Sequence, residues 1–477
     1  MTESSSLPTG RRALALDALR GLAILAMLLS SLVPDEVNLL PGWMYHAQVA
    51  PPHFIWSDRF PGITWVDLVF PFFLFSMGAA FPLAFSRRMD QGAPVWKLLA
   101  FVFERGFLLT FFALFVMDIR PHVLSANPDS ATMWAGLLGF VILFFILTRL
   151  PERWSFAARF GVRAVGWIGA GLFLGLANYP DGSGFRLTRS DIIIIVLANM
   201  AVFGSLIWMA TRKNLLVRLG VLGILMAVRL SNLPQPVPGW VHDAWMYSPL
   251  PWAYRLYYLQ YLNLVIAGTV AGDLILAWTR SETTNASWSL ARYACIFFTM
   301  AELVLLVVVG LKARWLPWTA FCVFGICAAS WFLYRKPLNA TEVLYQKLFN
   351  WAIYWLVLGL VFEPYEGGIK KDHPTMSYYF VTAGLAICVY IALSIIIDVL
   401  QRRRWLQLLI DNGQNPMIAY AGINNFILPL LALTGIDKRM EALATTPWRE
   451  FWKGVAIMLM IAFTVSFLTR RRIFWRT

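Results

Sequence analysis

Long apolar runs, each about 20 residues in length, recur from one end of this sequence to the other. An α-helix of that length spans the ~30 Å hydrocarbon core of a lipid bilayer. Because the bilayer core offers no water to backbone N–H and C=O groups, a chain that crosses it repeatedly does so as helices that satisfy their own backbone. The sequence therefore predicts an all-α fold, a polytopic transmembrane helical bundle.

Fourteen of these runs are candidates for membrane spans. They cover residues 12–33, 65–86, 97–118, 132–149, 158–177, 191–211, 214–231, 257–279, 291–311, 317–334, 347–365, 376–400, 415–435 and 451–470. Two runs, 158–177 and 214–231, are weaker candidates because each contains two arginines. The sequence therefore predicts eleven to fourteen spans in a single integral membrane domain that covers residues 1–477.

The composition supports membrane insertion and argues against a nucleic-acid-binding protein. Hydrophobic residues make up 59% of the chain and charged residues only 14%, whereas soluble domains carry about 25% charged residues. The net charge of +14 comes from basic residues dispersed at the ends of the apolar runs, rather than gathered on one face. The four cysteines lie inside apolar runs without a nearby histidine, so we expect neither a metal site nor a disulfide framework.

The distribution of lysine and arginine predicts the orientation of the chain, because cytoplasmic loops retain an excess of these residues. With the N-terminus in the cytoplasm and all fourteen runs spanning, five basic clusters face the cytoplasm: Arg87-Arg88, Arg212-Lys213, Arg335-Lys336, Arg402 to Arg404 and Arg470 to Arg472. We therefore expect both termini to be cytoplasmic. In this orientation all five histidines lie in outward-facing loops: His46, His53, His122, His242 and His373.

Ionisable residues inside the spans point to interaction sites. Each costs about 2.5 to 3.5 kcal/mol on insertion and therefore needs a partner or a water-filled cavity. Asp17 and Arg20 share one face of the first span, so we expect them to pair. Arg105 lies in the third span and needs a neighbour of its own. Asp67 begins the second span on the outward side, where a carboxylate can fix the tautomer of a histidine and raise its basicity.

One outward-facing loop combines turn-forming, basic and acidic residues. Residues 366–375 read E-G-G-I-K-K-D-H-P-T, with Lys370, Lys371 and His373 close together. The paired glycines permit a tight backbone turn. The two lysines offer positive charge either to an anionic or sugar-bearing ligand or to lipid phosphate, and both interpretations stay open.

Motifs near both ends of the chain resemble those of one enzyme family. Residues 16–23 read L-D-A-L-R-G-L-A, and after His53 residues 62–78 read G-I-T-W-V-D-L-V-F-P-F-F-L-F-S-M-G. Near the other end, residues 415–420 read N-P-M-I-A-Y and residues 472–476 read R-I-F-W-R. In this order the motifs resemble the heparan-alpha-glucosaminide N-acetyltransferase family, in particular its bacterial branch of undefined function.

The resemblance implies a membrane-bound acetyltransferase of the bacterial inner membrane. Such an enzyme takes acetyl-CoA from the cytoplasm as a co-substrate, without a permanently bound cofactor. It acetylates an amino sugar or another glycan acceptor on the far side of the bilayer. The expected partners are therefore the lipid bilayer, acetyl-CoA and the glycan acceptor, without nucleic acid, and a homodimer is a further expectation.

The resemblance and the chemistry of acetyl transfer together suggest roles for individual residues. The position of His53 before the G-x-T-x-x-D-L motif implies that it is the catalytic base, oriented by Asp67, with His46 as the alternative. Arg20 and Arg105, reached from the cytoplasmic side, would meet the phosphates or the pantetheine arm of the coenzyme. The other candidates for substrate or coenzyme binding are Asp17, Ser31, Lys370, Lys371, His373, Asn415 and Asn424.

Two other classes of function fit the same sequence. A transporter or flippase for a sugar- or lipid-linked substrate explains the spans and the buried charges without an acetyl donor, but it needs a continuous polar path. A non-catalytic membrane scaffold would retain the fold alone. Binding of acetyl-CoA separates both from an acetyltransferase.

Overall fold

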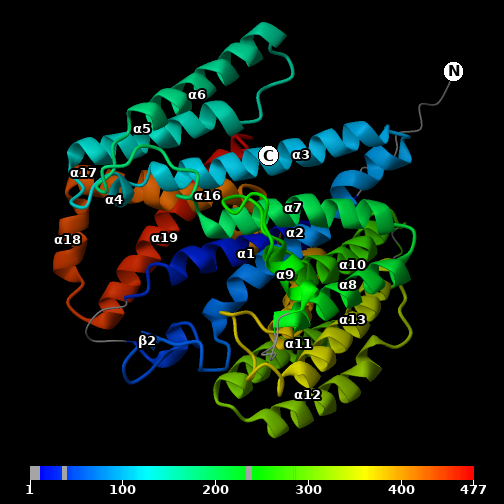
Figure 1. Ribbon diagram of the computed structural model, residues 1–477. Coiled ribbons are helices and arrows are strands. Elements are labelled where there is room, and N and C mark those ends of the chain that lie inside the picture. Colours follow the sequence, from blue (N-terminus) through cyan, green and yellow to red (C-terminus); the bar gives the residue numbers. More distant parts are fainter. Residues whose placement is uncertain (1–10, 35–39, 233–238, 283, 285, 477) are drawn as a thin grey trace, which may run out of the picture.

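The computed structural model of the chain describes residues 11–34, 40–232, 239–282, 284 and 286–476. Within these residues the fold is built almost entirely from helices (Figure 1). The one sheet that they contain is a short antiparallel hairpin of β1 (Val49–Ala50) and β2 (Ile55–Trp56). The predicted all-α helical bundle is therefore confirmed.

All fourteen apolar runs form helices in the described part of the chain. Their bounds are α1 (Leu14–Ser30), α2 (Trp65–Asp90), α3 (Val95–Asp118), α5 (Ser130–Leu147), α6 (Phe156–Leu176), α7 (Ile192–Thr211), α8 (Leu215–Arg229), α10 (Leu262–Thr279), α11 (Leu290–Lys312), α12 (Leu316–Ser330), α13 (Ala340–Phe362), α14 (Met376–Ser394), α16 (Pro416–Gly422) with α17 (Leu428–Thr434), and α19 (Pro447–Arg470). Shorter helices are α4 (Pro121–Leu124), α9 (Trp240–Met246), α15 (Gln407–Gln414) and α18 (Ile436–Leu443).

Eleven helical segments of the described chain are long and apolar enough to cross a membrane, which lies within the predicted range. Among the fourteen runs, α1 and α8 fall short because they have only 17 and 15 residues. α13 also falls outside the eleven, since its first half is rich in polar residues. These helices indicate a multi-pass membrane protein.

Side chains that cap helix N-termini set where several helices begin. Asp129 at α5, Asn214 at α8 and Thr446 at α19 each accept a hydrogen bond from a backbone N–H group of the first turn. At α2, Thr64 and Asp67 form a capping box. Capping satisfies N–H groups that have no partner within the helix, so each of these helices begins at a defined residue.

α1 is in backbone contact with α15. A Cβ atom added to Gly21 would lie 1.8 Å from the carbonyl oxygen of Leu409, and one added to Gly413 would lie 1.7 Å from the carbonyl oxygen of Asp17. Only residues without a side chain allow two helices to approach so closely. This contact fixes the position of Asp17 and Arg20 in the bundle, and Arg20 donates to the carbonyl oxygen of Gly413.

A second close contact joins α2 to α10. Cβ atoms added to Gly268 and Gly272 of α10 would lie 2.2 Å and 2.4 Å from the carbonyl oxygens of Phe75 and Ala79 of α2. Small residues at this spacing are typical of helix pairs in membranes, where close packing replaces the hydrophobic effect as the driving force. α2 is therefore held tightly on the side that faces α10.

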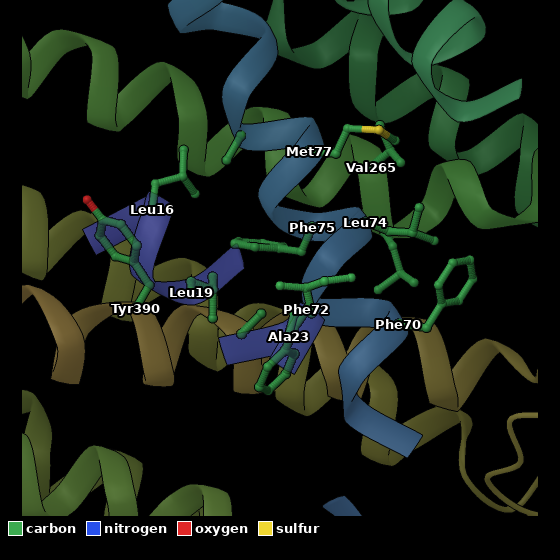
Figure 2. Packing of buried hydrophobic residues seen from close by; sticks show 14 of the residues in the cluster. Leu16, Leu19, Ala23, Phe70, Phe72, Leu74, Phe75, Met77, Val265 and Tyr390 are labelled. Atoms are coloured by element: carbon green, nitrogen blue, oxygen red, sulfur yellow. The ribbon is translucent and has the colours of Figure 1, made fainter. Parts of the chain in front are cut away.

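Apolar side chains of α1, α2 and α14 fill the space between these helices. Figure 2 shows Leu19 and Ala23 of α1 in the same buried cluster as Phe72 and Phe75 of α2 and Tyr390 of α14. All five side chains are almost inaccessible to solvent. α1 and α2 are thus rigidly placed, which matters because other faces of both helices line the cavities of the candidate site.

The two arginines that weaken the run 214–231 as a span are both buried and paired. Arg218 donates to Asp273 of α10 at 2.6 Å, and Arg229 lies 2.8 Å from Glu366. Removal of one partner from such a pair would leave an uncompensated buried charge. The second pair also ties the loop of residues 366–375 to α8.

α5 and α6 form a helical hairpin at the edge of the bundle (Figure 1). Large apolar side chains of α6 are exposed, among them Phe156, Phe160, Ile168 and Leu172. Water would disfavour such a surface, whereas lipid tails would not. The exposed face of α6 therefore fits a helix that contacts lipid.

Candidate functional site

His46 and Asp67 form a hydrogen-bonded pair at the N-terminal end of α2. Nδ1–H of His46 donates to Oδ1 of Asp67 at 2.8 Å, and the Asp67 side chain is fully buried. Oδ2 of Asp67 accepts hydrogen bonds from the backbone N–H groups of Ala47 and Thr64. Because a carboxylate only accepts, it holds the imidazole as the Nδ1–H tautomer and leaves Nε2 as an acceptor.

His53 is an exposed residue of the turn between β1 and β2. The expected pairing of His53 with Asp67 is therefore wrong, and the alternative, His46, occupies that position. The physical reason is the hairpin, which carries His53 away from α2 while His46, before β1, stays against it. The Pro51-Pro52 dipeptide is the sequence signal for this turn.

Lys371 lies against His46. Its Nζ is 3.3 Å from Nδ1 and 3.4 Å from Nε2 of the imidazole. Lys370 is half-buried and His373 is exposed, and neither lines the cavity into which His46 opens. Of the three basic residues predicted from this loop, the structure therefore brings one to the histidine.

The loop that carries Lys371 is fastened by its turn geometry and by a buried ion pair. Gly367 and Gly368 have φ angles of +75° and +92°, in the left-handed region, so the predicted tight turn is confirmed. Glu366, the preceding residue, pairs with Arg229 of α8. Both features fix the position of Lys371 relative to the bundle.

His46 lines an outer cavity with a volume of about 460 Å³. Ser31 at the end of α1, Lys371 and Asn424 also line this outer cavity, so three predicted binding residues lie around the same space as the histidine. Asn424 belongs to a π-helical turn, Ile423–Ile427, that joins α16 to α17. Such turns often occur at functional sites because they reorient side chains out of the helical register.

An inner cavity of about 250 Å³ lies next to the outer one and is lined by three arginines: Arg20 of α1, Arg105 of α3 and Arg476. Arg20 lies 3.7 Å from Asp17, which confirms the predicted pair, and Asp17 also accepts a hydrogen bond from Arg12. Arg105 has no ion-pair partner among the described residues, and its Nε is buried without a hydrogen-bond partner. The inner cavity therefore carries an excess of positive charge.

The two cavities meet at Met27, Ile193 and Tyr420, which line both. Along α2, residues between 73 and 84 line the inner cavity, whereas residues 69 and 70 line the outer one. The cavities are therefore stacked along the helices. In the orientation predicted from the basic clusters, the arginine-lined cavity lies toward the cytoplasm and His46 lies toward the outside.

Asn415, predicted as a substrate contact, has a structural role instead. Its side-chain amide donates to the carbonyl oxygen of Ile473 at 2.7 Å, and its side-chain oxygen accepts from the N–H of Trp475 at 3.1 Å. Asn415 is buried and lines neither cavity. By fastening the C-terminal segment, it holds Arg476 at the inner cavity.

Three residues that the sequence did not assign to the site form a network where the cavities meet. Arg120 and the hydroxyl group of Tyr420 both donate to Oδ2 of Asp191, each at 2.7 Å. Arg120 lines the outer cavity, and Tyr420 lines both. The residues are 71 and 229 positions from Asp191, so no local pattern joins them. The available signals were an arginine just beyond the third span and the tyrosine that ends the motif of residues 415–420.

Comparison with known proteins places the chain in a family. No curated protein matches it in sequence. A family model described as "Domain of unknown function (DUF5009)" matches residues 12–275, which is more than half of the chain. The matched part contains His46, Asp67 and the inner-cavity residues Arg20 and Arg105, whereas Lys371 lies beyond it. The chain therefore belongs to the DUF5009 family.

Proposed function

We propose that the protein is a membrane-bound acetyltransferase of the bacterial inner membrane. It transfers an acetyl group from cytoplasmic acetyl-CoA to an amino sugar or another glycan acceptor on the opposite face. One observation carries the proposal: an arginine-lined cavity and a cavity with an oriented histidine meet inside the bundle at Met27, Ile193 and Tyr420. The resemblance of the motifs to the heparan-alpha-glucosaminide N-acetyltransferase family supports the same reaction.

The inner cavity is suited to the acetyl donor. Arg20, Arg105 and Arg476 provide more positive charge than Asp17 balances. Guanidinium groups bind phosphate oxygens in paired hydrogen bonds, and coenzyme A carries three phosphates next to its pantetheine arm. At about 250 Å³ the cavity accommodates the acetylated end of that arm rather than the whole coenzyme. The phosphates would therefore meet the arginines at the entrance while the thioester points toward Tyr420.

The outer cavity is suited to the acceptor. Asp67 holds His46 with Nε2 as an acceptor, which is the form that a general base requires. The Nζ of Lys371, 3.4 Å from Nε2, lies where the ammonium group of an incoming amino sugar would have to bind. The acceptor amine would therefore take the place of the lysine ammonium beside the imidazole.

His46 and water together account for every proton that moves during acetyl transfer. His46 removes a proton from the acceptor ammonium, and the nitrogen lone pair attacks the thioester carbonyl carbon. The C–N bond forms, the carbonyl oxygen becomes an oxyanion, and its collapse breaks the C–S bond. The coenzyme leaves as a thiolate, which takes up the proton held by His46. The acceptor nitrogen loses a second proton to water, and the amide is complete.

An assay of acetyl transfer tests this proposal. Purified protein in lipid nanodiscs is incubated with acetyl-CoA labelled in the acetyl group and with a panel of amino sugars and cell-wall fragments. The proposal predicts label on at least one amino-bearing acceptor and release of free coenzyme A in equal amount. Absence of both label transfer and acetyl-CoA binding would contradict it.

A transporter is the second candidate, because two cavities stacked along the helices also resemble a substrate path through the membrane. A transporter would move the sugar without consuming acetyl-CoA. The same nanodisc preparation, reconstituted into vesicles, separates the two functions. Uptake of labelled sugar in the absence of acetyl-CoA would favour transport, and acetylation without net uptake of unmodified sugar would favour the enzyme.

A further inference from the structure

Arg120 is held by one carboxylate at the place where the two cavities meet. It follows α3 in the chain, and its Nη2 donates to Oδ2 of Asp191 at 2.7 Å. The hydroxyl group of Tyr420 donates to the same oxygen. The Arg120 guanidinium and the Tyr420 hydroxyl therefore lie on the same side of Asp191, next to the junction of the cavities.

Both oxygens of the Asp191 carboxylate are already occupied by hydrogen-bond donors. Its Oδ1 accepts hydrogen bonds from the backbone N–H groups of Ile193 and Ile194 at the start of α7. With two donors on each oxygen, the carboxylate is a fixed anchor rather than a base. The helix N-terminus adds a favourable dipole to the same negative charge.

Arg120, by contrast, still has donors to offer. Its Nη2 binds Asp191. Nε also has no hydrogen-bond partner, but it is buried, so the N–H groups that remain for the cavity are on the two terminal nitrogens. The side chain is 16% exposed, and it lines the outer cavity. A guanidinium that is anchored on one side and open on the other is preorganised to bind a negative charge that develops in the cavity.

We infer that Arg120 is the residue that binds the oxyanion during acetyl transfer, with Tyr420 lining the same site. This inference rests on the proposed function, because it needs a thioester carbonyl at the junction of the cavities. As the acceptor nitrogen attacks, the carbonyl π electrons move onto oxygen, and that oxygen receives hydrogen bonds from the free N–H groups of Arg120. When the C–S bond breaks, the electrons return and the bonds to Arg120 weaken.

The other cations are less suited to this role. Lys371 contacts the imidazole of His46 and occupies the place of the acceptor amine. Arg20, Arg105 and Arg476 line the inner cavity only, where the proposed function places the phosphates. Among the cationic side chains described along the two cavities, Arg120 is the one whose carboxylate partner, Asp191, also accepts a hydrogen bond from Tyr420.

The test compares Arg120→Gln with Arg189→Gln in nanodiscs. Arg189 pairs with buried Asp118 at 3.2 Å and with Asp181 at 3.4 Å, has a side chain that is 15% exposed, and lines neither cavity, so it matches Arg120 in burial and is likewise held by carboxylate. The steady-state rate of acetyl transfer to D-glucosamine, or to the acceptor found in the transfer assay, gives kcat and KM. Titration with coenzyme A gives its dissociation constant, and thermal unfolding reports the fold.

The inference predicts that Arg120→Gln lowers kcat by about 10²- to 10³-fold, as for loss of an oxyanion donor. The dissociation constant of coenzyme A should stay within about twofold, and Arg189→Gln should keep the wild-type kcat. If Arg120→Gln does not fold, Arg120→Lys decides. The lysine ammonium retains the ion pair with Asp191 but lacks the planar set of N–H donors of the guanidinium, so Arg120→Lys should lower kcat by about tenfold.

Three results would overturn the inference: a folded Arg120→Gln or Arg120→Lys with the wild-type kcat, an equal loss of kcat in Arg189→Gln, or a loss confined to coenzyme A affinity. Each leaves acetyl transfer by the wild-type protein intact. A wild-type protein that transfers no acetyl group would instead contradict the proposed function.

Discussion

The two oxygens of the Asp67 carboxylate have different tasks. Oδ2 accepts hydrogen bonds from Thr64 and Ala47 and thereby fixes both the start of α2 and the chain beside it. Oδ1 orients His46. The imidazole is therefore positioned by the end of a rigid helix rather than by a free loop, which is what a general base needs.

Replacement of His46 by alanine should lower the rate of acetyl transfer by about 10²- to 10⁴-fold, because the base is removed. His53→Ala is the matched control, since His53 is exposed and lines neither cavity. The measurement is the initial rate of label transfer at saturating acetyl-CoA. An active His46→Ala variant, or an inactive His53→Ala variant, would contradict the assignment of the base.

Replacement of Arg105 by glutamine should weaken binding of acetyl-CoA by about tenfold, which corresponds to about 1.4 kcal/mol. The reason is that Arg105 offers an unbalanced positive charge to the inner cavity. Arg163→Gln is the control, because Arg163 donates to backbone carbonyl oxygens of Phe145 and Thr148 and lines neither cavity. Titration of each variant with acetyl-CoA measures the effect; equal dissociation constants for Arg105→Gln and the wild type would count against the phosphate site.

At the scale of elements, the contact between α1 and α15 determines where the inner cavity lies. Gly21 and Gly413 bring the two backbones together, and Arg20, next to Gly21, donates to the carbonyl oxygen of Gly413. The motif of residues 16–23 therefore has a physical explanation: its glycine permits the close approach, and its arginine reaches the cavity.

Replacement of Gly21 by valine should destabilise the protein by about 3 kcal/mol or more, whereas overpacking typically costs about 1 to 3 kcal/mol. The cost is high because the added Cβ would meet backbone atoms rather than a movable side chain. Gly161→Val in α6 is the control, since nothing lies within 4 Å of a Cβ added there. Thermal unfolding followed by tryptophan fluorescence measures both variants. Equal melting temperatures would contradict the described packing of α1 on α15.

At the scale of the whole molecule, the helices could be predicted from the sequence because span length and apolar composition are local properties. All fourteen runs became helices. The site could be predicted only in part. Asp67 and Arg20 follow from motifs, but the choice between His46 and His53 depends on a hairpin that moves one of them away. Local patterns give no hint of the contact between Arg120 and Asp191, because it depends on how α3 and α7 pack.

The orientation of the whole chain is also testable. Asn127 follows α4 on the side predicted to face outward, and Gln91 follows α2 on the side predicted to face the cytoplasm; both side chains are exposed. Asn127→Cys should therefore react with a membrane-impermeant thiol reagent in intact cells, whereas Gln91→Cys should react only after the membrane is permeabilised. The wild-type chain, with its four cysteines, gives the background. The opposite labelling pattern would reverse the assignment of the inner and outer cavities.

In the proposed function, a donor from one face of the membrane and an acceptor from the other meet inside the bundle. The most direct measurement uses sealed vesicles that contain the protein in one orientation, with labelled acetyl-CoA on the side of the arginine-lined cavity and the amino sugar on the side of His46. Labelled acetylated sugar should appear on the His46 side and free coenzyme A on the other. Label transfer only when both compounds are on the same side, or no transfer in either arrangement, would contradict it.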